Sequence, residues 1–191
     1  MVKTKVSTEN SLVPYITKKG TGDKGTKVIF KMNKVSINKN MHLSEHITLG
    51  EVTKTSVKTA DGNIPSHVAI ENLKNLCENW LEDLRYSYNT LYPTSRDDNP
   101  IIITSGYRSP EVNRAVGGSP TSNHLTGCAV DIRCEGIEQA LRYANILMDI
   151  SDGTKLDYDE LFIERSKQGR YWIHFAVRPK DNRRKTAFIL T

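Results

Sequence analysis

The sequence predicts an α+β fold, in which helices pack against a mainly antiparallel sheet. Two segments, about 66–88 and about 137–148, place apolar residues at helical spacing. Four shorter apolar or alternating segments are typical of strands: residues 101–104, 128–133, 160–164 and 171–177. The last two flank a turn at 166–170, as in a β-hairpin. Because the helices are segregated against this sheet, the chain belongs to the α+β class.

Residues 1–40 are expected to form a basic N-terminal arm or hairpin. They are rich in Lys, Thr and Gly; the alternating segment 27–31 is typical of a strand, and residues 20–25 are typical of a turn. The remainder, 41–191, is expected to be one globular domain with a basic C-terminal tail. A chain of 191 residues with 37% hydrophobic content is sufficient for one compact core.

The main core helix is expected to begin after Ser66, which follows Pro65 and is a favoured N-cap residue. Its apolar face consists of Ile70, Leu73, Cys77, Trp80, Leu81, Leu84 and Tyr88. The second helix is expected to bury Ile137, Ala140, Leu141, Ala144 and either Leu147 or Met148. Between the helices, residues 109–122 are mostly loop, with one helical turn at 111–116.

The net charge of +5 is unevenly distributed. The two ends of the chain are rich in Lys and Arg, whereas the middle is acidic. Basic ends are expected either to attract an anionic polymer, envelope or nucleic acid, or to act only as a solubilising surface. Nucleic-acid binding is the weaker interpretation, because the aromatic residues are not interleaved with the basic runs.

The three cysteines, Cys77, Cys128 and Cys134, are an odd number, which excludes a complete set of disulfides and suits a reducing compartment. Cys128 and Cys134 lie near the polar motif described next, so a ligand role is one interpretation. In a strand they share a face with Val130 and Ile132, opposite Asp131, which favours buried core thiols.

Two motifs carry the functional signal: Ser122-Asn123-His124-Leu125-Thr126-Gly127-Cys128-Ala129-Val130-Asp131, and Trp172-Ile173-His174. One continuous helix would separate His124 from Asp131 by about 10 Å, so the chain must bend between them, and Gly127 permits that bend. Strand alternation places His174 on the same face as Trp172. Two imidazoles and a carboxylate are ligands that zinc uses when one position stays open. We therefore predict a metal site of His124, Asp131 and His174, with Zn²⁺ as the ion.

These residues resemble the S-x-H-x-x-G-x-A-x-D and W-x-H signatures of the zinc D-Ala-D-Ala carboxypeptidase and peptidoglycan endopeptidase family, in its phage and bacterial branch. The resemblance runs from about Leu43 to Val177 and includes a short lead-in at 43–52. It implies the hedgehog/DD-peptidase-like fold and a zinc peptidase-like domain over 41–191. Arg108, in the turn Ser-Gly-Tyr-Arg, matches an arginine that similar enzymes aim at the substrate; the alternative is a structural salt bridge.

The catalytic base is where the chain departs from the better-known members, which carry an acid three positions before the last histidine. That position is Tyr171 here. In the branch that the chain resembles, the acid lies on the preceding strand, so Glu164 is the candidate base. The alternative is a solvent-facing carboxylate paired with Arg165 or Lys167. The resemblance further implies substrate contacts for Ser122, Tyr107 and Trp172.

The resulting hypothesis is a zinc metallopeptidase that hydrolyses a D-amino-acid-containing bond of peptidoglycan, as a carboxypeptidase or a cross-link endopeptidase. Its substrates would be peptidoglycan stem peptides, with an anionic wall polymer as a possible further partner of the basic ends. The rival hypothesis is a non-catalytic, zinc-stabilised module that binds a peptide or protein, such as a virion or assembly component. The absence of an acid at Tyr171 supports that rival.

The beginning of the sequence lacks the apolar stretch of a secretory signal, and no apolar run reaches the roughly 20 residues that span a bilayer. The protein is therefore expected to be synthesised in the cytoplasm without a signal peptide. An endolysin-like role at the cell wall would then require host lysis, packaging in a virion or non-classical export.

Overall fold

A computed structural model describes residues 37–94 and 98–191. They belong to one compact unit, Val35–Thr191. The predicted arm or hairpin lies outside the described residues, apart from the last few positions before residue 41. Among the helices that are described, none has the combination of length and hydropathy needed to cross a bilayer.

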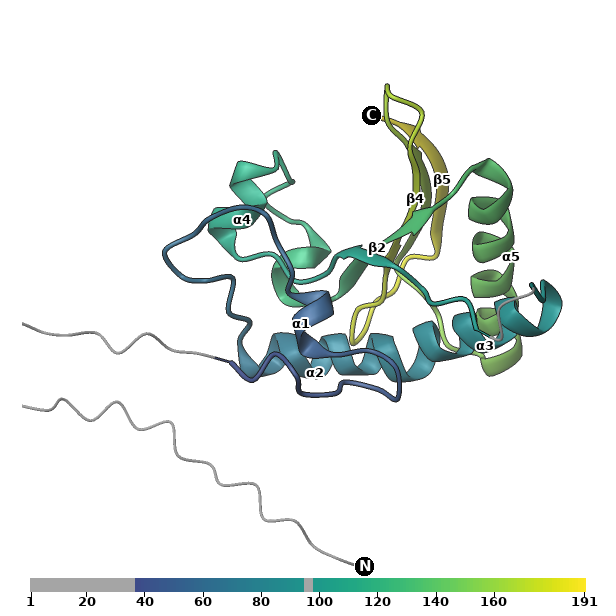
Figure 1. The fold of residues 1–191 in the computed structure, drawn as a ribbon, viewed down its shortest axis with the longest axis horizontal. Helices are drawn as coiled ribbons and strands as arrows, with labels where there is room; N and C mark the ends of the chain where they lie inside the picture. Colours follow the sequence, from purple (N-terminus) through teal and green to yellow (C-terminus); the bar gives the residue numbers. More distant parts are fainter. Residues whose placement is uncertain (1–36, 95–97) are drawn as a thin grey trace, which may run out of the picture. The chain divides into compact units, whose positions relative to one another are not determined.

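A five-stranded sheet forms the centre of the unit, in the order β1-β2-β4-β3-β5 (Figure 1). The strands are β1 (Ile103–Ser105), β2 (Ala129–Cys134), β3 (Glu160–Arg165), β4 (Tyr171–Ala176) and β5 (Lys185–Leu190). Neighbouring strands are antiparallel except β3 and β5, which are parallel. The predicted α+β class with a mainly antiparallel sheet is therefore confirmed, and so is the hairpin made by β3 and β4.

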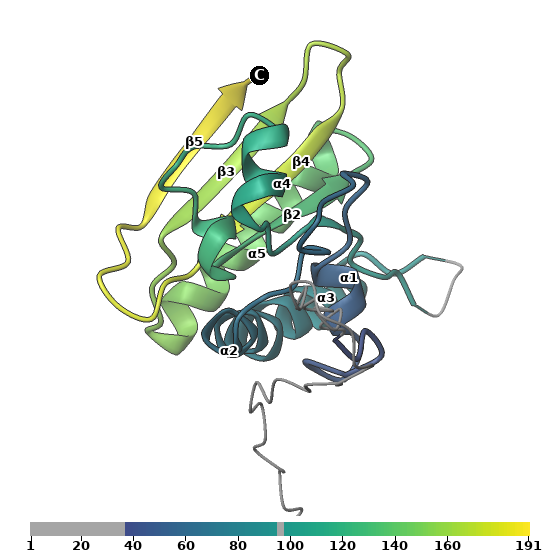
Figure 2. The same ribbon diagram turned by 90° about the vertical axis from the view of Figure 1, so that its left-hand side faces the viewer.

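Helical segments lie on both sides of this sheet (Figure 2). They are α1 (Leu49–Val52), α2 (His67–Leu76), the π-helical segment η1 (Cys77–Leu81), α3 (Glu82–Leu91), α4 (Pro110–Ala115), the 3-10 helix η2 (Asn123–Thr126) and α5 (Ile137–Thr154). Helix α5 packs against β2, β3 and β4 from one face, and α4 and η2 lie on the opposite face. The second face holds the candidate functional residues.

The predicted core helix is present as α2, η1 and α3 in continuous succession. Ser66 is its N-cap, and the Ser66 side chain accepts a hydrogen bond from the backbone N–H of Ala69 at 3.2 Å. The π-helical turn was not predicted, because a single wide turn leaves the apolar spacing almost unchanged. Trp80 at this turn is buried and packs against Phe175 of β4, with ring centroids 5.1 Å apart. The helix thus supports the sheet directly behind the site.

Helix α5 is longer than predicted and buries only part of the predicted set of side chains, together with others. Tyr143 and Ile146 are buried, whereas Ile137 and Leu141, which we expected on the apolar side, are 39% and 55% exposed. That part of the prediction was wrong. Leu141 and Tyr143 point about 200° apart on a helix, on opposite sides of the stripe formed by Ala140 and Ala144, and the buried stripe extends toward Tyr143.

Strand β5 lies within the basic C-terminal segment and was not predicted. It pairs in parallel with β3, from Glu160 beside Lys185 to Arg165 beside Leu190. Nearly all of its residues are exposed, since it forms one edge of the sheet. The segment that leads into it contributes arginines to the site described below.

Candidate metal centre

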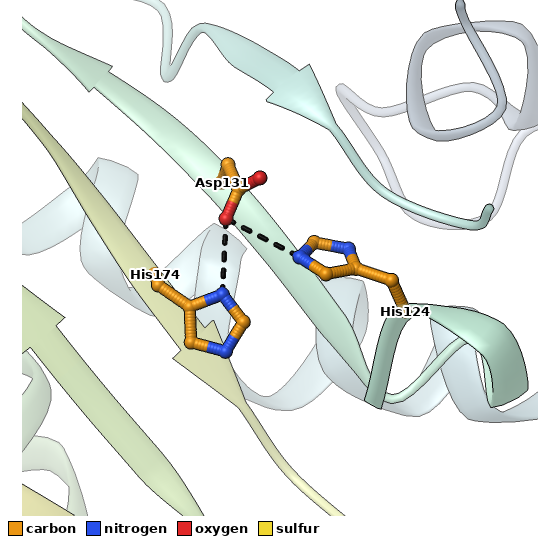
Figure 3. A group of neighbouring side chains, drawn as sticks. All are labelled: His124, Asp131 and His174. Atoms are coloured by element: carbon orange, nitrogen blue, oxygen red, sulfur yellow. Dashed lines mark hydrogen bonds and ion pairs between the residues drawn. The ribbon is translucent and has the colours of Figure 1, made fainter. Parts of the chain in front are cut away.

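Asp131 and His174 are direct neighbours across the ladder between β2 and β4. The Nδ1 atom of His174 lies 3.0 Å from Oδ1 of Asp131, and the Nε2 atom of His124 lies 3.3 Å from the same oxygen (Figure 3). The three side chains therefore converge on one point. One ligand atom from each of them falls within 4.8 Å of the others, as the binding of a single ion requires. The structure thus brings together the three residues that the sequence analysis selected as ligands.

A tight bend brings His124 to this point. Gly127 ends η2 with φ +71°, a left-handed conformation that glycine adopts without steric cost. A Cβ atom at Gly127 would lie only 2.3 Å from the carbonyl oxygen of Ala69 on α2. Glycine is therefore required both by the backbone angle and by the close approach of the helix. Ser122 caps η2 and accepts a hydrogen bond from the backbone N–H of His124 at 3.3 Å.

The orientation of the His124 ring favours a cation at Nε2, the ring nitrogen that faces Asp131. Nδ1 lies 2.6 Å from the carbonyl oxygen of Gly106, which can only accept, so Nδ1 carries the proton. In the neutral ring Nε2 then holds a lone pair. That atom is buried, makes no hydrogen bond among the described residues, and faces a carboxylate oxygen of Asp131. Two electron-pair donors facing each other are both satisfied by a cation between them, so these residues fit a metal ion.

The groups around Asp131 keep its carboxylate in the ionised form that binds metals. Burial works against ionisation of Asp131, but the neighbouring imidazoles of His124 and His174 hold its pKa well below the usual range. Burial also disfavours protonation of His174, but hydrogen bonds to Asp131 and Glu160 outweigh it and raise the pKa of His174 to about 9. In the metal-free protein a proton thus occupies the place that a metal would take at His174.

Arg108 lies beside the cluster, in an ion pair with Asp131. Its Nε atom donates to the Ser105 hydroxyl at 2.8 Å, and its backbone N–H donates to the carbonyl of His124 at 3.0 Å. The structural salt bridge that we considered as an alternative role is therefore present. Arg108 also lines the cavity in front of the cluster, so a contact with substrate is sterically open as well.

A cavity of about 510 Å³ opens onto the three residues. Its walls also include Thr104, Arg108, Val116, Gly117, Gly118, Ser119, Ser122, Glu164, Trp172 and Thr191. Four of the residues for which we predicted catalytic or substrate contacts, namely Arg108, Ser122, Glu164 and Trp172, are therefore brought together around one space. Tyr107 is not among its lining residues, and belongs instead to the hydrophobic core at 8% exposure.

Glu164 pairs with Trp172 across the β3–β4 ladder, two residue pairs from the one that holds His174 and on the same face of the sheet. Its carboxylate takes part in no hydrogen bond or ion pair that the described residues make, including with Arg165 or Lys167. Burial raises the pKa of Glu164, against the opposing effect of the His174 charge. A half-buried, unengaged carboxylate in a cavity is suited to accepting a proton.

Glu160 is a neighbour of the cluster that the sequence analysis missed. Its Oε2 atom lies 3.4 Å from Nε2 of His174, on the side of the ring away from Asp131. The hydrogen bond with His174 is the main reason that the pKa of Glu160 is lowered. The sequence did contain a signal for Glu160. Glu160, Phe162 and Glu164 alternate along the predicted strand, so Glu160 lies on the same face as Glu164, the candidate base.

Tyr171 points to the opposite side of the sheet from His174. The two positions are three residues apart on a regular strand, and side chains alternate between faces. Tyr171 accordingly packs against the hydrophobic core, and the Arg165 guanidinium lies 5.7 Å from the centre of its ring. An acid at position 171 would not face the cavity in this sheet, so its absence is no argument against catalysis.

Comparison with known proteins assigns the chain to a family. A search among curated proteins found no match. A family model described as Peptidase M15 matches residues 45–158, more than half of the chain. The match contains His124 and Asp131 and ends before β3. His174 lies outside the match, and the pairing of β4 with β2 brings it next to Asp131. The chain is a member of the Peptidase M15 family.

Proposed function

We propose that the protein is a zinc metallopeptidase that hydrolyses a D-amino-acid-containing peptide bond of peptidoglycan. The observation that carries the proposal is the shared cavity, in which the His124, Asp131 and His174 cluster lies next to the unengaged carboxylate of Glu164. A ligand cluster alone would serve a structural ion equally well. An acid with a raised pKa in the same cavity adds a group that can transfer protons.

His124, Asp131 and His174 would hold the ion. When bound, zinc supplies Lewis-acid chemistry, which activates water and polarises a carbonyl group. Glu164 takes the proton from the attacking water and delivers it to the nitrogen of the departing amine. The raised pKa of Glu164 suits both steps, because the group must gain and then lose a proton near neutral pH.

Arg108 stabilises the negative charge that develops on the substrate oxygen. Its Nε and one terminal nitrogen are engaged with Ser105 and Asp131, which fixes the plane of the guanidinium group. The other terminal nitrogen is in no hydrogen bond among the described residues, and so retains donors for a substrate oxygen. A guanidinium held in place before the reaction stabilises that charge without reorganising.

The substrate class rests on the Peptidase M15 membership and on the two motifs shared with peptidoglycan peptidases. Hydroxyl and glycine residues on the cavity wall, such as Gly117, Gly118, Ser119 and Ser122, suit a polar, extended peptide, and Trp172 offers an apolar surface beside it. Stem peptides of the cell wall are peptides of this kind. D-Ala-D-Ala ends and cross-links are the two candidate bonds.

The test is an assay of purified protein of known metal content on D-Ala-D-Ala-terminated and on cross-linked muropeptides, with and without a chelator. Products are identified by mass spectrometry. Chelator-sensitive release of D-Ala, or cleavage of a cross-link, is expected. A zinc-loaded protein that leaves all of these peptides intact would reject the proposed activity and favour a peptide-binding module.

A further inference from the structure

His174 has a carboxylate at each of its two ring nitrogens. Asp131 lies 3.0 Å from Nδ1, and Glu160 lies 3.4 Å from Nε2. The two acids come from β2 and β3, the strands on either side of β4. A neutral ring that offers Nδ1 to a cation carries its proton on Nε2, and Glu160 is the acceptor placed to receive that proton in a hydrogen bond.

Glu160 is itself held in place from two sides. Its Oε2 atom accepts a hydrogen bond from the side-chain amide of Asn123 at 3.0 Å, and its Oε1 atom accepts one from Arg183 at 2.6 Å. Asn123 immediately precedes His124. The side-chain amide of Asn123 therefore connects the η2 turn, which carries His124, to Glu160, which contacts His174.

Asp159 anchors this arrangement in the interior. Its side chain is fully buried and accepts hydrogen bonds from Arg183 at 2.8 and 2.6 Å and from Asn123 at 2.9 Å. Arg183 and Asn123 therefore each bridge the consecutive acids Asp159 and Glu160. A two-pronged guanidinium contact of this kind fixes direction as well as distance.

The stacking of Phe162 on His174 does not replace the hydrogen bond. The two rings lie 5.6 Å apart between centroids at an interplanar angle of 19°, which restrains the tilt of the imidazole. An apolar ring face does not select which nitrogen carries the proton. Among the described residues, Glu160 is the group that makes this selection at Nε2.

We propose that Glu160, held by Asn123 and Arg183, is a positioning residue that fixes the ring orientation and the proton of His174 for metal binding. The inference rests on the proposed metal site, because it concerns the affinity of that site for its ion. Glu160 and Arg183 both lie beyond the residues that the family model matches.

The first test compares zinc affinities of the parent, Glu160→Ala and Glu160→Gln by competition with a chromophoric chelator. Glu160→Ala is expected to bind zinc about 10- to 100-fold more weakly, the usual cost of losing such a partner. Glu160→Gln should recover much of the loss, because its amide oxygen still accepts from Nε2. Glu138→Gln, which changes an exposed acid on α5, is the control and is expected to retain the parent's affinity.

A second pair of variants, at the neighbouring residues Arg183 and Arg184, tests whether the hydrogen bond from Arg183 holds Glu160 in place. Arg183→Met should weaken zinc binding several-fold, whereas Arg184→Met should not, since Arg184 pairs with Asp152 and Asp157 and does not contact Glu160. The proton on Nε2 of His174 is observed directly in imidazole ¹⁵N spectra of the zinc-loaded protein. Circular dichroism checks that each variant is folded.

Two results would overturn the inference, and they differ from failure of the proposed function. Parent-like zinc affinity in folded Glu160→Ala would remove the role of Glu160 while leaving the metal site intact. Equal losses of zinc affinity in Glu160→Ala and Glu160→Gln, with no proton on Nε2 of His174, would show that the hydrogen bond from His174 does not support zinc binding. A parent protein that binds no zinc at all would instead refute the metal site itself.

Discussion

Glu160 and Glu164 project from the same face of β3, on either side of the residue row that contains His174. Glu160 is engaged with His174, Asn123 and Arg183, and its pKa is lowered. Glu164 faces the cavity without such partners, and its pKa is raised. Two acids four residues apart on one strand thus have environments that suit different tasks, one of support and one of proton transfer.

Glu164→Gln is expected to lower the rate of peptide hydrolysis by about 10²- to 10⁴-fold, the usual contribution of a general base. Metal content should not change, because Glu164 does not contact the ligands. Steady-state kinetics on the cleaved muropeptide, together with metal analysis, measures both. Glu138→Gln, which alters an exposed acid on α5, is the control for loss of one negative charge. Full activity in Glu164→Gln would assign the proton transfer elsewhere.

Removal of the metal is expected to lower the unfolding temperature. An ion present at about 100 times its dissociation constant adds about 2.7 kcal/mol to the free energy of unfolding, which for a domain of this size corresponds to roughly 5–10 °C. Thermal unfolding with and without a chelator measures the shift. In His124→Ala the chelator should have no effect. A shift of the parent's size in that variant would mean that the stabilising ion is bound outside the cluster.

Asp159 is expected to make stability sensitive to acid. Burial opposes its ionisation, but hydrogen bonds from Arg183 and Asn123 lower its pKa to about 2, below an ordinary value of about 3.9. This contribution is fully present above the ordinary value and is lost as the pH falls through about 2. Asp159→Asn should therefore be less stable than the parent by on the order of 2 kcal/mol at pH 7, and the difference should shrink between pH 4 and pH 2.

Urea unfolding over this pH range tests the acid sensitivity. The control is Asp152→Asn, whose exposed ion pair with Arg184 should contribute less than about 1 kcal/mol at any pH. A constant difference between Asp159→Asn and the parent down to pH 2 would contradict the assignment of the lowered pKa to this contact.

Gly127→Ala is expected to be much more costly than Gly117→Ala. Both glycines have φ near +70°, but the space around Gly117 is open, whereas a Cβ at Gly127 meets the carbonyl oxygen of Ala69. The left-handed backbone alone costs about 1–2 kcal/mol, and that is the loss expected for Gly117→Ala. Gly127→Ala should exceed it and should also weaken metal binding, since the clash shifts His124. Equal stabilities of the two variants would contradict the close approach of α2.

Local pattern was enough to predict the elements that carry the cluster. His124, Asp131 and His174 were found because each lies in a motif of several residues, and the bend at Gly127 followed from distance alone. Strand alternation also predicted the buried thiols. Cys128 and Cys134 are buried and free, and burial raises the pKa of both, so they belong to the core.

Features that depend on long-range pairing were not predicted. Strand β5 is mostly exposed, so its sequence shows no alternation, and its pairing with β3 follows a reversal through the loop after β4. Glu160 and Arg183 were missed for the same reason, because a charged residue gains a structural role only when distant partners surround it. The side of the sheet that Tyr171 occupies, by contrast, follows from strand alternation alone.

The position of β4 between β2 and β3 has a consequence for how the protein is made. Asp131 leaves the ribosome 43 residues before His174, and the intervening chain contains α5 and β3. A nascent chain that stops short of β4 has only two of the three ligands, His124 and Asp131. The three-ligand site can therefore form only once β4 has been synthesised.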